Sequence, residues 1–269
     1  MMAHVWSPDA KQDLAFWDFM SFPVVFHLGP LVIQAHFLFE MLAYFVGLRF
    51  YQHLRNKRGD ALDEDRRIGV MIGGILGAAL GSKILGLLEH PKLLFQLHEN
   101  LVYFLASKTI VGGLIGGLIG VEATKKLLGV SRSTGDLFCI PIILGMMIGR
   151  IGCFLAGVSD GTWGQQTDWI LAMDGGDGVM RHPMPLYEIG VLSLIWLAIT
   201  QLKGRPSLQD GDLFKFFMVT YLAWRFSAEF LKPSTPIPVL GISAIQFACL
   251  LTLLYYHKFI LNFRTLLVR

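Results

Sequence analysis

Long apolar stretches recur along this chain, and their length restricts the folds that it can adopt. A run of about 20 apolar residues is long enough to cross a lipid bilayer as an α-helix. Such runs lie at 31–49, 68–88, 101–122, 136–157, 184–202, 212–231 and 239–260. The sequence therefore predicts an all-α, polytopic integral membrane protein with about seven transmembrane helices, formed as a single membrane domain over residues 1–269.

The composition agrees with a membrane protein. Hydrophobic residues make up 54% of the chain and charged residues only 16%, whereas soluble domains carry about 25% charged residues. The net charge of +3 is small, and no basic run is interleaved with aromatic residues, so no nucleic acid partner is expected. Cys139, Cys153 and Cys249 lie in apolar runs without the spacing of disulfides or metal sites. We therefore expect no metal and no cofactor, and the N-terminus has no pattern of a cleavable signal peptide.

The loops predict an orientation. Most loop lysines and arginines fall on one side of the predicted membrane: Arg49, Arg55, Lys57, Arg58, Arg66, Arg67, Lys125, Lys126, Arg132, Lys203, Arg205, Lys258, Arg264 and Arg269. The opposite side has fewer: Lys11, Lys92, Lys108, Arg181 and Lys232. Because basic loops stay in the cytoplasm, the N-terminus is expected outside and the C-terminus in the cytoplasm.

Two outer segments stand apart from the spans. Residues 1–29 are mixed and aromatic, and aromatic residues favour the membrane–water interface, so we expect an interfacial lead-in. The longest outer loop, 158–183, is rich in Gly and Asp and contains Trp163 and Trp169. Loops of this length are often functional, although a disordered connector is equally compatible with the composition.

Charged residues inside the apolar runs are the clearest functional signal. Lys83, Arg150 and Arg225 lie within predicted spans, where a charge costs roughly 2.5–3.5 kcal/mol on insertion scales. In the predicted orientation both arginines lie in the outer halves of their helices, at the depth of outer-leaflet headgroups. A guanidinium donates two parallel hydrogen bonds to phosphate oxygens and keeps its charge. The two arginines therefore predict a site for a lipid phosphodiester.

Self-neutralisation is an alternative for one of these arginines. Glu229 follows Arg225 by four residues and shares its helical face, so this pair can be explained by tolerance of burial alone. Arg150 has no acid three or four positions away on its own helix. Its position in the stretch Gly149–Gly164 therefore favours a functional role.

Glycines repeat at four-residue spacing in the third apolar run. Gly112, Gly116 and Gly120 follow this spacing, and Gly113 and Gly117 repeat it one position later. Small residues at such spacing are typical of close helix packing in membranes. Packing explains most of them, and the pair Gly112–Gly113 at mid-depth also leaves room for an acyl chain or a substrate helix.

Five ordered motifs together resemble the prolipoprotein diacylglyceryl transferase family. The start of the first span, Pro23–Pro30, is similar to that of the family. The other matches are Gly149–Phe154 with Gly157 for the family's "GRIGNF…G", Arg181–Glu188 for "RHP-x-QLYE", Arg225–Phe230 for "RF-x-x-EF" and Gly241–Gln246 for "S-x-x-Q". The resemblance covers most of the chain.

The resemblance implies a reaction and a set of roles. The family transfers the diacylglyceryl group of phosphatidylglycerol to the lipobox cysteine thiol in the signal peptide of a preprolipoprotein, and glycerol phosphate is released. The expected partners are phosphatidylglycerol, this signal peptide and membrane lipids, in a multi-pass protein of the bacterial cytoplasmic (inner) membrane. Catalytic roles are expected for Arg150, Arg225, Glu229 and His36. Phospholipid binding is expected at Arg150, Arg225, Cys153, Gly157, Gly112, Gly113, Lys83, His182, Tyr187 and Glu188.

The chain also departs from the family pattern. Val111 replaces the histidine before the double glycine, Cys153 the asparagine after "GRIG", and His36 a tyrosine of the first span. Lys83 and Lys232 stand where arginines are usual. The loss of the histidine at Val111 removes the candidate base for the acceptor thiol.

These departures leave two questions open. The base is either elsewhere, with His36, Glu40 and His182 as candidates, or unnecessary, because a thiol with a pKa near 8.5 needs only modest electropositive help. Cys153 is either an acyl-carrying nucleophile or, as a small buried residue, part of the packing. The alternatives for the whole protein are a divergent member acting on another acceptor and a non-catalytic phospholipid-binding or translocating membrane protein.

Overall fold

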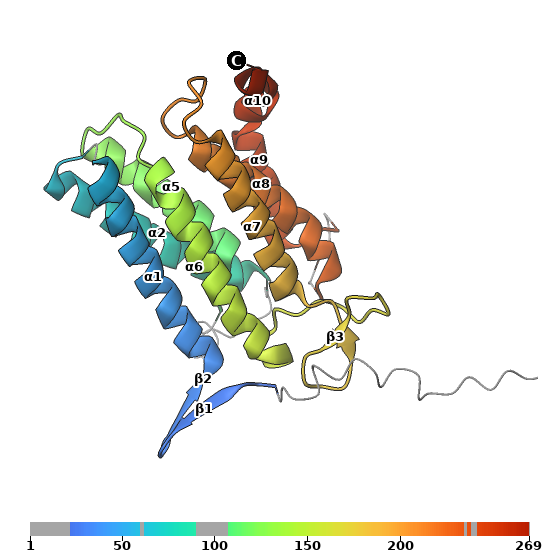
Figure 1. Ribbon diagram of the computed structural model, residues 1–269. Coiled ribbons are helices and arrows are strands. Elements are labelled where there is room, and N and C mark those ends of the chain that lie inside the picture. The colour runs from blue at the N-terminus through green and yellow to red at the C-terminus, as the bar shows by residue number, and fades with distance from the viewer. Residues whose placement is uncertain (1–21, 60–61, 90–106, 234–235, 238–240, 269) are drawn as a thin grey trace, which may run out of the picture.

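The computed structural model describes residues 22–59, 62–89, 107–233, 236–237 and 241–268 of the chain, which form mainly a bundle of long helices (Figure 1). The α-helices are α1 (Ala35–Arg58), α2 (Glu64–Glu89), α5 (Ile110–Leu127), α6 (Asp136–Leu155), α7 (Met184–Leu202), α8 (Asp212–Ala228), α9 (Ala244–Tyr255) and α10 (His257–Val268). Two short 3-10 helices, η2 (Gly157–Asp160) and η3 (Glu229–Leu231), follow α6 and α8. The mainly helical fold agrees with the prediction.

The first apolar run does not begin as a helix. β1 (Val25–Leu28) and β2 (Leu31–Gln34) pair antiparallel around a turn at Gly29-Pro30, where Gly29 has φ +61°. β-branched residues in the second strand suit this conformation, and the first helix begins only at Ala35. The predicted span from residue 31 was therefore wrong at its start, and the predicted interfacial lead-in ends in a strand, with residues 1–21 lying outside the described part.

Two other predicted spans also differ in their bounds. The third begins at Ile110, after Thr109 has capped the helix by accepting a hydrogen bond from the Gly112 N–H, and residues 101–106 lie outside the described part. The last is divided at Tyr256 between α9 and α10. An apolar run alone does not reveal such breaks, because hydropathy carries no signal for a cap or a bend.

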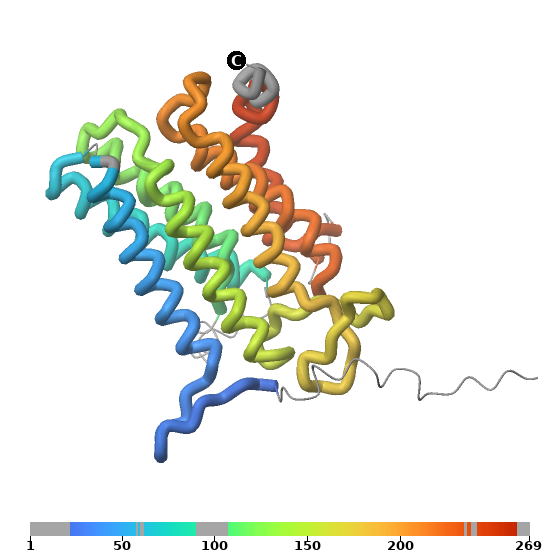
Figure 2. The backbone as a smooth tube through the Cα atoms, viewed as in Figure 1, coloured from blue at the N-terminus to red at the C-terminus, as the bar shows by residue number. Residues whose placement is uncertain are grey.

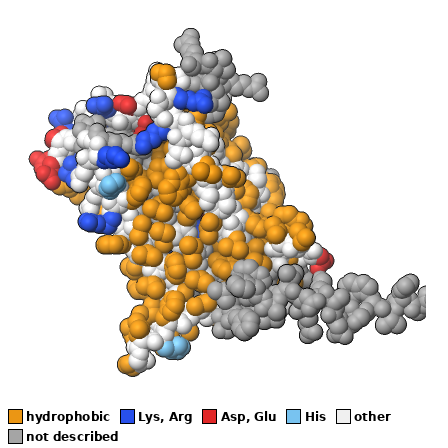
Figure 3. Space-filling view, viewed as in Figure 1, with side chains coloured by type: hydrophobic (Ala, Val, Ile, Leu, Met, Phe, Trp, Pro, Cys, Tyr) orange, Lys and Arg blue, Asp and Glu red, His pale blue; other side chains and the backbone are white. Residues whose placement is uncertain are grey.

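Several helices have the properties of membrane spans. Among the described residues, α2, α6 and α7 are long and apolar enough to cross a membrane, and α9 is a shorter apolar helix. Many large hydrophobic side chains on the outside are exposed, including Ile75 at 65% and Leu80 at 64%. Figure 3 shows hydrophobic side chains over the middle of the molecule, with lysines and arginines gathered toward one end. A surface of this kind is matched to lipid rather than to water.

Glycines hold α2 and α5 together at close range. A Cβ on Gly116 would overlap the backbone oxygen of Gly77, and a Cβ on Gly112 would overlap that of Gly81. The two backbones touch along this face, as expected for small residues at four-residue spacing. The prediction that packing explains most of these glycines agrees with this contact.

The 158–183 loop is folded against the end of the bundle (Figure 2). β3 (Met173–Asp174) and β4 (Met180–Arg181) form a small antiparallel pair. The Val158 N–H donates to the Gly175 oxygen at 3.0 Å, and the Gln165 N–H donates to the Leu231 oxygen at 2.8 Å. In addition, Arg181 donates a hydrogen bond to Asp177 at 2.7 Å, which lowers the pKa of that carboxyl group. The loop therefore joins the end of α6 to the end of α8.

The α2–α5 contact predicts the effect of one added methyl group. Gly116→Ala should destabilise the protein by about 1–3 kcal/mol, because overpacking forces the two backbones apart, and should lower the melting temperature of the purified protein in detergent. Gly190→Ala on α7 is the matched control, since a Cβ there has no atom within 4 Å. Equal melting temperatures for the two variants would contradict the packing role.

Candidate active site

Arg150 is buried between three helices. Its residue exposure is 6%, and Nε lies 3.0 Å from Oε1 of Glu188 on α7, which is 4% exposed. Tyr221 on α8 donates a hydrogen bond to the same Glu188 oxygen at 2.7 Å. The counter-ion that Arg150 lacks on its own helix is thus supplied by α7 and held in place from α8.

Arg225 has the partner that its own helix predicts. Its Nη2 donates to Oε2 of Glu229 at 2.9 Å, and both residues are 4% exposed. Glu188 also interacts electrostatically with both Arg150 and Arg225. We call Arg150, Glu188, Tyr221, Arg225 and Glu229 the arginine cluster. It lies near the ends of α6 and α8, beside the 158–183 loop.

Both arginines keep unused donors. Among the described residues, neither the buried Nε of Arg150 nor that of Arg225 makes a hydrogen bond. The Nε of Arg150 does lie 3.0 Å from Glu188 Oε1, in an ion pair without the alignment of a hydrogen bond. An unsatisfied buried donor costs about 1–3 kcal/mol, and more in a charged group. Such donors in a cationic cluster suit an anion with several acceptor oxygens, and a phosphodiester is one.

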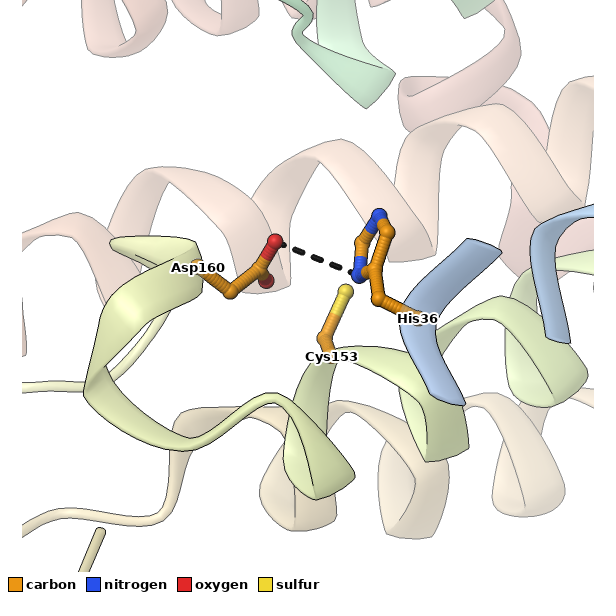
Figure 4. Close-up of side chains that lie close together, drawn as sticks. All are labelled: His36, Cys153 and Asp160. Carbon is orange, nitrogen blue, oxygen red and sulfur yellow. Dashed lines mark ion pairs between the residues drawn. The ribbon is translucent and has the colours of Figure 1, made fainter. Parts of the chain in front are cut away.

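A second group lies next to Arg150. Its Nη1 donates to the Cys153 sulfur at 3.5 Å, and this sulfur lies with His36 and Asp160 (Figure 4). His36 Nδ1 is 3.2 Å from Asp160 Oδ1. The side chains come from α1, α6 and η2, so three elements meet at this point.

The three candidate bases have different partners, although two of them are neighbours, with His36 Nε2 at 4.0 Å from Glu40 Oε2. Glu40 is engaged by Lys108, with 2.8 Å between Oε1 and Nζ. His182 Nδ1 is 3.3 Å from the Tyr187 hydroxyl, and both rings lie 6.0 Å from that of Trp169. His36, in contrast, lies in the group beside Arg150. Of the predicted lipid-binding residues, His182 and Tyr187 thus belong to an aromatic group on the loop side.

Three other predicted lipid-binding residues have mainly structural surroundings. Gly112 packs on Gly81. A Cβ added at Gly113 would lie 3.8 Å from the Ala78 oxygen, which is an ordinary van der Waals contact. Gly157 has φ +66°, and a Cβ there would overlap the Gly175 oxygen. Gly157 therefore permits the turn that leads from α6 into the loop.

The remaining departures occupy two environments. Lys83 interacts electrostatically with Glu40 and Lys108, on the side of His36. Val111 is 1% exposed and belongs to the apolar core. An apolar side chain thus stands where the resemblance leads one to expect a histidine.

Sequence reasoning missed Tyr221 and Asp160. Tyr221 precedes Arg225 by four residues and so shares its helical face, which was an available signal. Asp160 lies in a loop ten residues after Arg150, and nothing in its local sequence indicates that it turns back toward α1. The turn depends on Gly157 and Gly161, both with φ +66°.

Comparison with known proteins covers most of the chain. The model of the family described as prolipoprotein diacylglyceryl transferase matches residues 23–261. The phosphatidylglycerol–prolipoprotein diacylglyceryl transferase of Bordetella avium is 34% identical over 78% of this chain and 81% of that protein. Proteins of the same name from Geobacter sulfurreducens and Cupriavidus metallidurans are 31% and 33% identical, over 84% and 83% of this chain and 87% and 84% of their own lengths.

The buried ion pair predicts a large effect of removing its anion. Glu188→Gln should destabilise the protein by about 3–5 kcal/mol, because it leaves the Arg150 charge buried without its counter-ion. The measurement is unfolding of the purified protein in detergent. Glu122→Gln is the matched control, since this side chain is 54% exposed in its pair with Lys125. A Glu188 variant as stable as the control would contradict the assigned pairing.

Proposed function

The chain belongs to the prolipoprotein diacylglyceryl transferase family, and on that premise we propose that it transfers the diacylglyceryl group of phosphatidylglycerol to the cysteine thiol of a preprolipoprotein signal peptide. Glycerol phosphate is the second product. The observation that carries the proposal is the pair of buried arginines, Arg150 and Arg225, each with an Nε donor that no described residue satisfies. Both arginines also stand in motifs that match the family.

We also propose that the protein crosses the bacterial inner membrane about seven times, with its N-terminus outside. The basic residues gathered at one end of the molecule (Figure 3) support a cytoplasmic position for that end. α6 and α8 both finish at the 158–183 loop, which the hydrogen bond between Gln165 and Leu231 ties to η3. The arginine cluster then lies at the depth of outer-leaflet headgroups.

In the proposed mechanism the arginines act on the phosphate. Arg150 and Arg225 bind its oxygens while the acceptor thiolate attacks the glycerol carbon of the diacylglyceryl group. The carbon–oxygen bond to the phosphate breaks as the carbon–sulfur bond forms, so one negative charge moves from sulfur to the departing glycerol phosphate. Fixed donors that face developing charge in a water-poor site stabilise the transition state.

Three neighbours position these arginines. Glu188 holds Arg150, the Tyr221 hydroxyl holds Glu188, and Glu229 holds Arg225. Their contribution is orientation, which limits the movement that each guanidinium must make when the lipid binds. The ion pairs also keep both charges stable in an apolar bundle until the anion arrives.

On the acceptor side we assign His36. It lies in the group beside Arg150, whereas Glu40 is engaged by Lys108 and His182 by Tyr187. Its imidazole therefore serves to produce the thiolate form of the acceptor cysteine.

The arginines are tested by conservative replacement. Arg150→Lys and Arg225→Lys should each reduce transfer from phosphatidylglycerol to a lipobox peptide by about 10²–10³-fold, because lysine keeps the charge but loses the two-pronged donor geometry. Glycerol phosphate release is the measurement. Arg132→Lys is the matched control, since this side chain is 63% exposed and pairs with Asp210 at the other end of α6.

Two outcomes would count against the transferase. Wild-type protein that releases no glycerol phosphate with any lipobox peptide contradicts transfer to that acceptor. Movement of labelled phospholipid between leaflets without product would instead support the non-catalytic alternative.

Lys232 adds a cation at the edge of the site. It directly follows η3, is half-buried, and its backbone oxygen accepts a hydrogen bond from Gln165 at 3.0 Å. Burial, together with the nearby charges of Arg225 and Arg150, lowers the pKa of its ammonium group to about 8. The side chain is therefore a cation at neutral pH and becomes neutral as the pH rises through that value.

This shift predicts a pH dependence. If protonated Lys232 assists phosphate binding, wild-type activity loses that help above pH 8, whereas Lys232→Arg keeps its charge. The ratio of Lys232→Arg to wild-type activity should therefore increase from pH 7 to pH 9, which a transfer assay across this range measures. A flat ratio, equal to that of the exposed control Lys203→Arg, would contradict a role for the charge.

A further inference from the structure

Three side chains with metal-binding atoms meet beside Arg150. His36 from the start of α1, Cys153 near the end of α6 and Asp160 at the end of η2 each offer one ligand atom, and these atoms all lie within 4.8 Å of one another (Figure 4). Tetrahedral zinc with nitrogen, sulfur and oxygen ligands requires about 3.5 Å between neighbouring ligand atoms. Small side-chain rotations therefore bring the three atoms to that spacing.

The fold brings these residues together by two devices. At Gly152 a Cβ would lie 2.8 Å from the Phe39 Cβ and 3.2 Å from the His36 oxygen, so a glycine here lets α1 approach α6. The short turn of η2, which begins at a glycine of positive φ and is followed by another, returns Asp160 toward α1. Both devices act on the backbone and place the three side chains on one point.

A simple ion pair does not explain this arrangement. His36 Nδ1 lies 3.2 Å from Asp160 Oδ1, but it is a buried nitrogen without a hydrogen-bond partner in the described part of the chain. Leaving such an atom unsatisfied costs about 1–3 kcal/mol. A metal ion bound by Nδ1 removes this cost, and it also explains why a thiol is the third member of the group.

We propose that His36, Cys153 and Asp160 bind a divalent transition-metal ion of the zinc class. Imidazole, thiolate and carboxylate are all zinc ligands, and three protein ligands with one open position are typical of catalytic zinc. The thiolate and the carboxylate together neutralise the charge of the dication. This proposal replaces the expectation from the sequence that the protein binds no metal, which rested on the spacing of the cysteines alone.

The surroundings of the three residues suit metal ligands. The other ring nitrogen of His36, Nε2, lies 4.0 Å from Glu40 Oε2, and a carboxylate near the second nitrogen is the usual support of a metal-bound histidine. The Thr162 hydroxyl donates to Asp160 Oδ2 at 2.8 Å. Arg150 donates a hydrogen bond to the Cys153 sulfur at 3.5 Å. Each ligand is thus oriented by a neighbour.

The position of the site assigns it a role, which rests on the proposed transferase function. The open position of the metal binds the acceptor cysteine as a thiolate, and the thiol proton passes to water. That sulfur then attacks the glycerol carbon of the lipid held by the arginines, and the phosphate leaves with the electrons of the broken carbon–oxygen bond. The chain thereby activates the thiol without the histidine that Val111 replaces.

Metal content tests the site directly. Full-length protein, purified in detergent after equilibration with zinc and removal of the unbound ion, should retain about one zinc per chain by mass spectrometry of the element. His36→Ala, Cys153→Ala and Asp160→Ala should each lose most of it. Cys139→Ala is the matched control, because Cys139 is a buried cysteine of the same helix. Zinc retained equally by all four variants, or by none of the proteins including wild type, overturns the site.

Cobalt reports on the ligands and on the open position. In cobalt-substituted wild-type protein a thiolate-to-metal absorption band should appear, and Cys153→Ala should abolish it. Addition of a lipobox peptide should strengthen the band, whereas the same peptide with serine for cysteine should not. A band unchanged by the cysteine peptide overturns the acceptor role. Because wild type is compared with and without peptide, misfolding of a variant does not affect this reading.

Chelation separates this inference from the transferase proposal. Protein stripped of metal should lose at least about tenfold in transfer rate and recover on addition of zinc. A full rate after complete loss of zinc overturns metal activation of the thiol and leaves the transferase intact, with His36 as the base. Zinc binding without transfer to any lipobox peptide has the opposite meaning, because the metal site then stands and the proposed function fails.

Discussion

The ion pair between Arg150 and Glu188 is the interaction on which the site depends. A guanidinium inside an apolar bundle is unstable unless an anion lies beside it, and α6 supplies none. Glu188 from α7 meets this need, and the Tyr221 hydroxyl from α8 fixes the carboxylate. Neutralising one charge therefore links three helices. The same link places the guanidinium group for which we propose phosphate binding at the meeting point of those helices.

Glycines let other segments approach this ion pair closely enough to complete the site. Where α1 meets α6, Gly152 lets the first helix approach closely enough for His36 to reach Cys153. Gly164 has the same effect in the loop, since a Cβ there would lie 2.8 Å from the Leu231 oxygen at the end of η3. The positions of charged groups in this bundle are thus set by residues without side chains. Such contacts do not tolerate an added methyl group.

The sequence predicted contacts between residues that are close together in the chain, but not contacts between different helices. The Arg225–Glu229 pair follows from four-residue spacing on one helix, and it is present at 2.9 Å. The partner of Arg150 lies 38 residues further along the chain, on another helix, so spacing carries no signal for it. The β1–β2 hairpin shows the same limit, because an apolar run fits a strand or a helix until Gly29-Pro30 is recognised as a two-residue turn.

The site has two halves that relate differently to the family pattern. In the half proposed to bind the phosphate, Arg150, Glu188, Arg225 and Glu229 all stand in matching motifs and form two ion pairs. In the half proposed to face the acceptor, two of the residues that differ, His36 and Cys153, meet within one group of possible ligand atoms. Unrelated substitutions have no reason to converge on one point. Under the proposed function, this convergence favours retained lipid binding with a changed means of activating the acceptor, and the proposed metal ion would account for both substitutions at once.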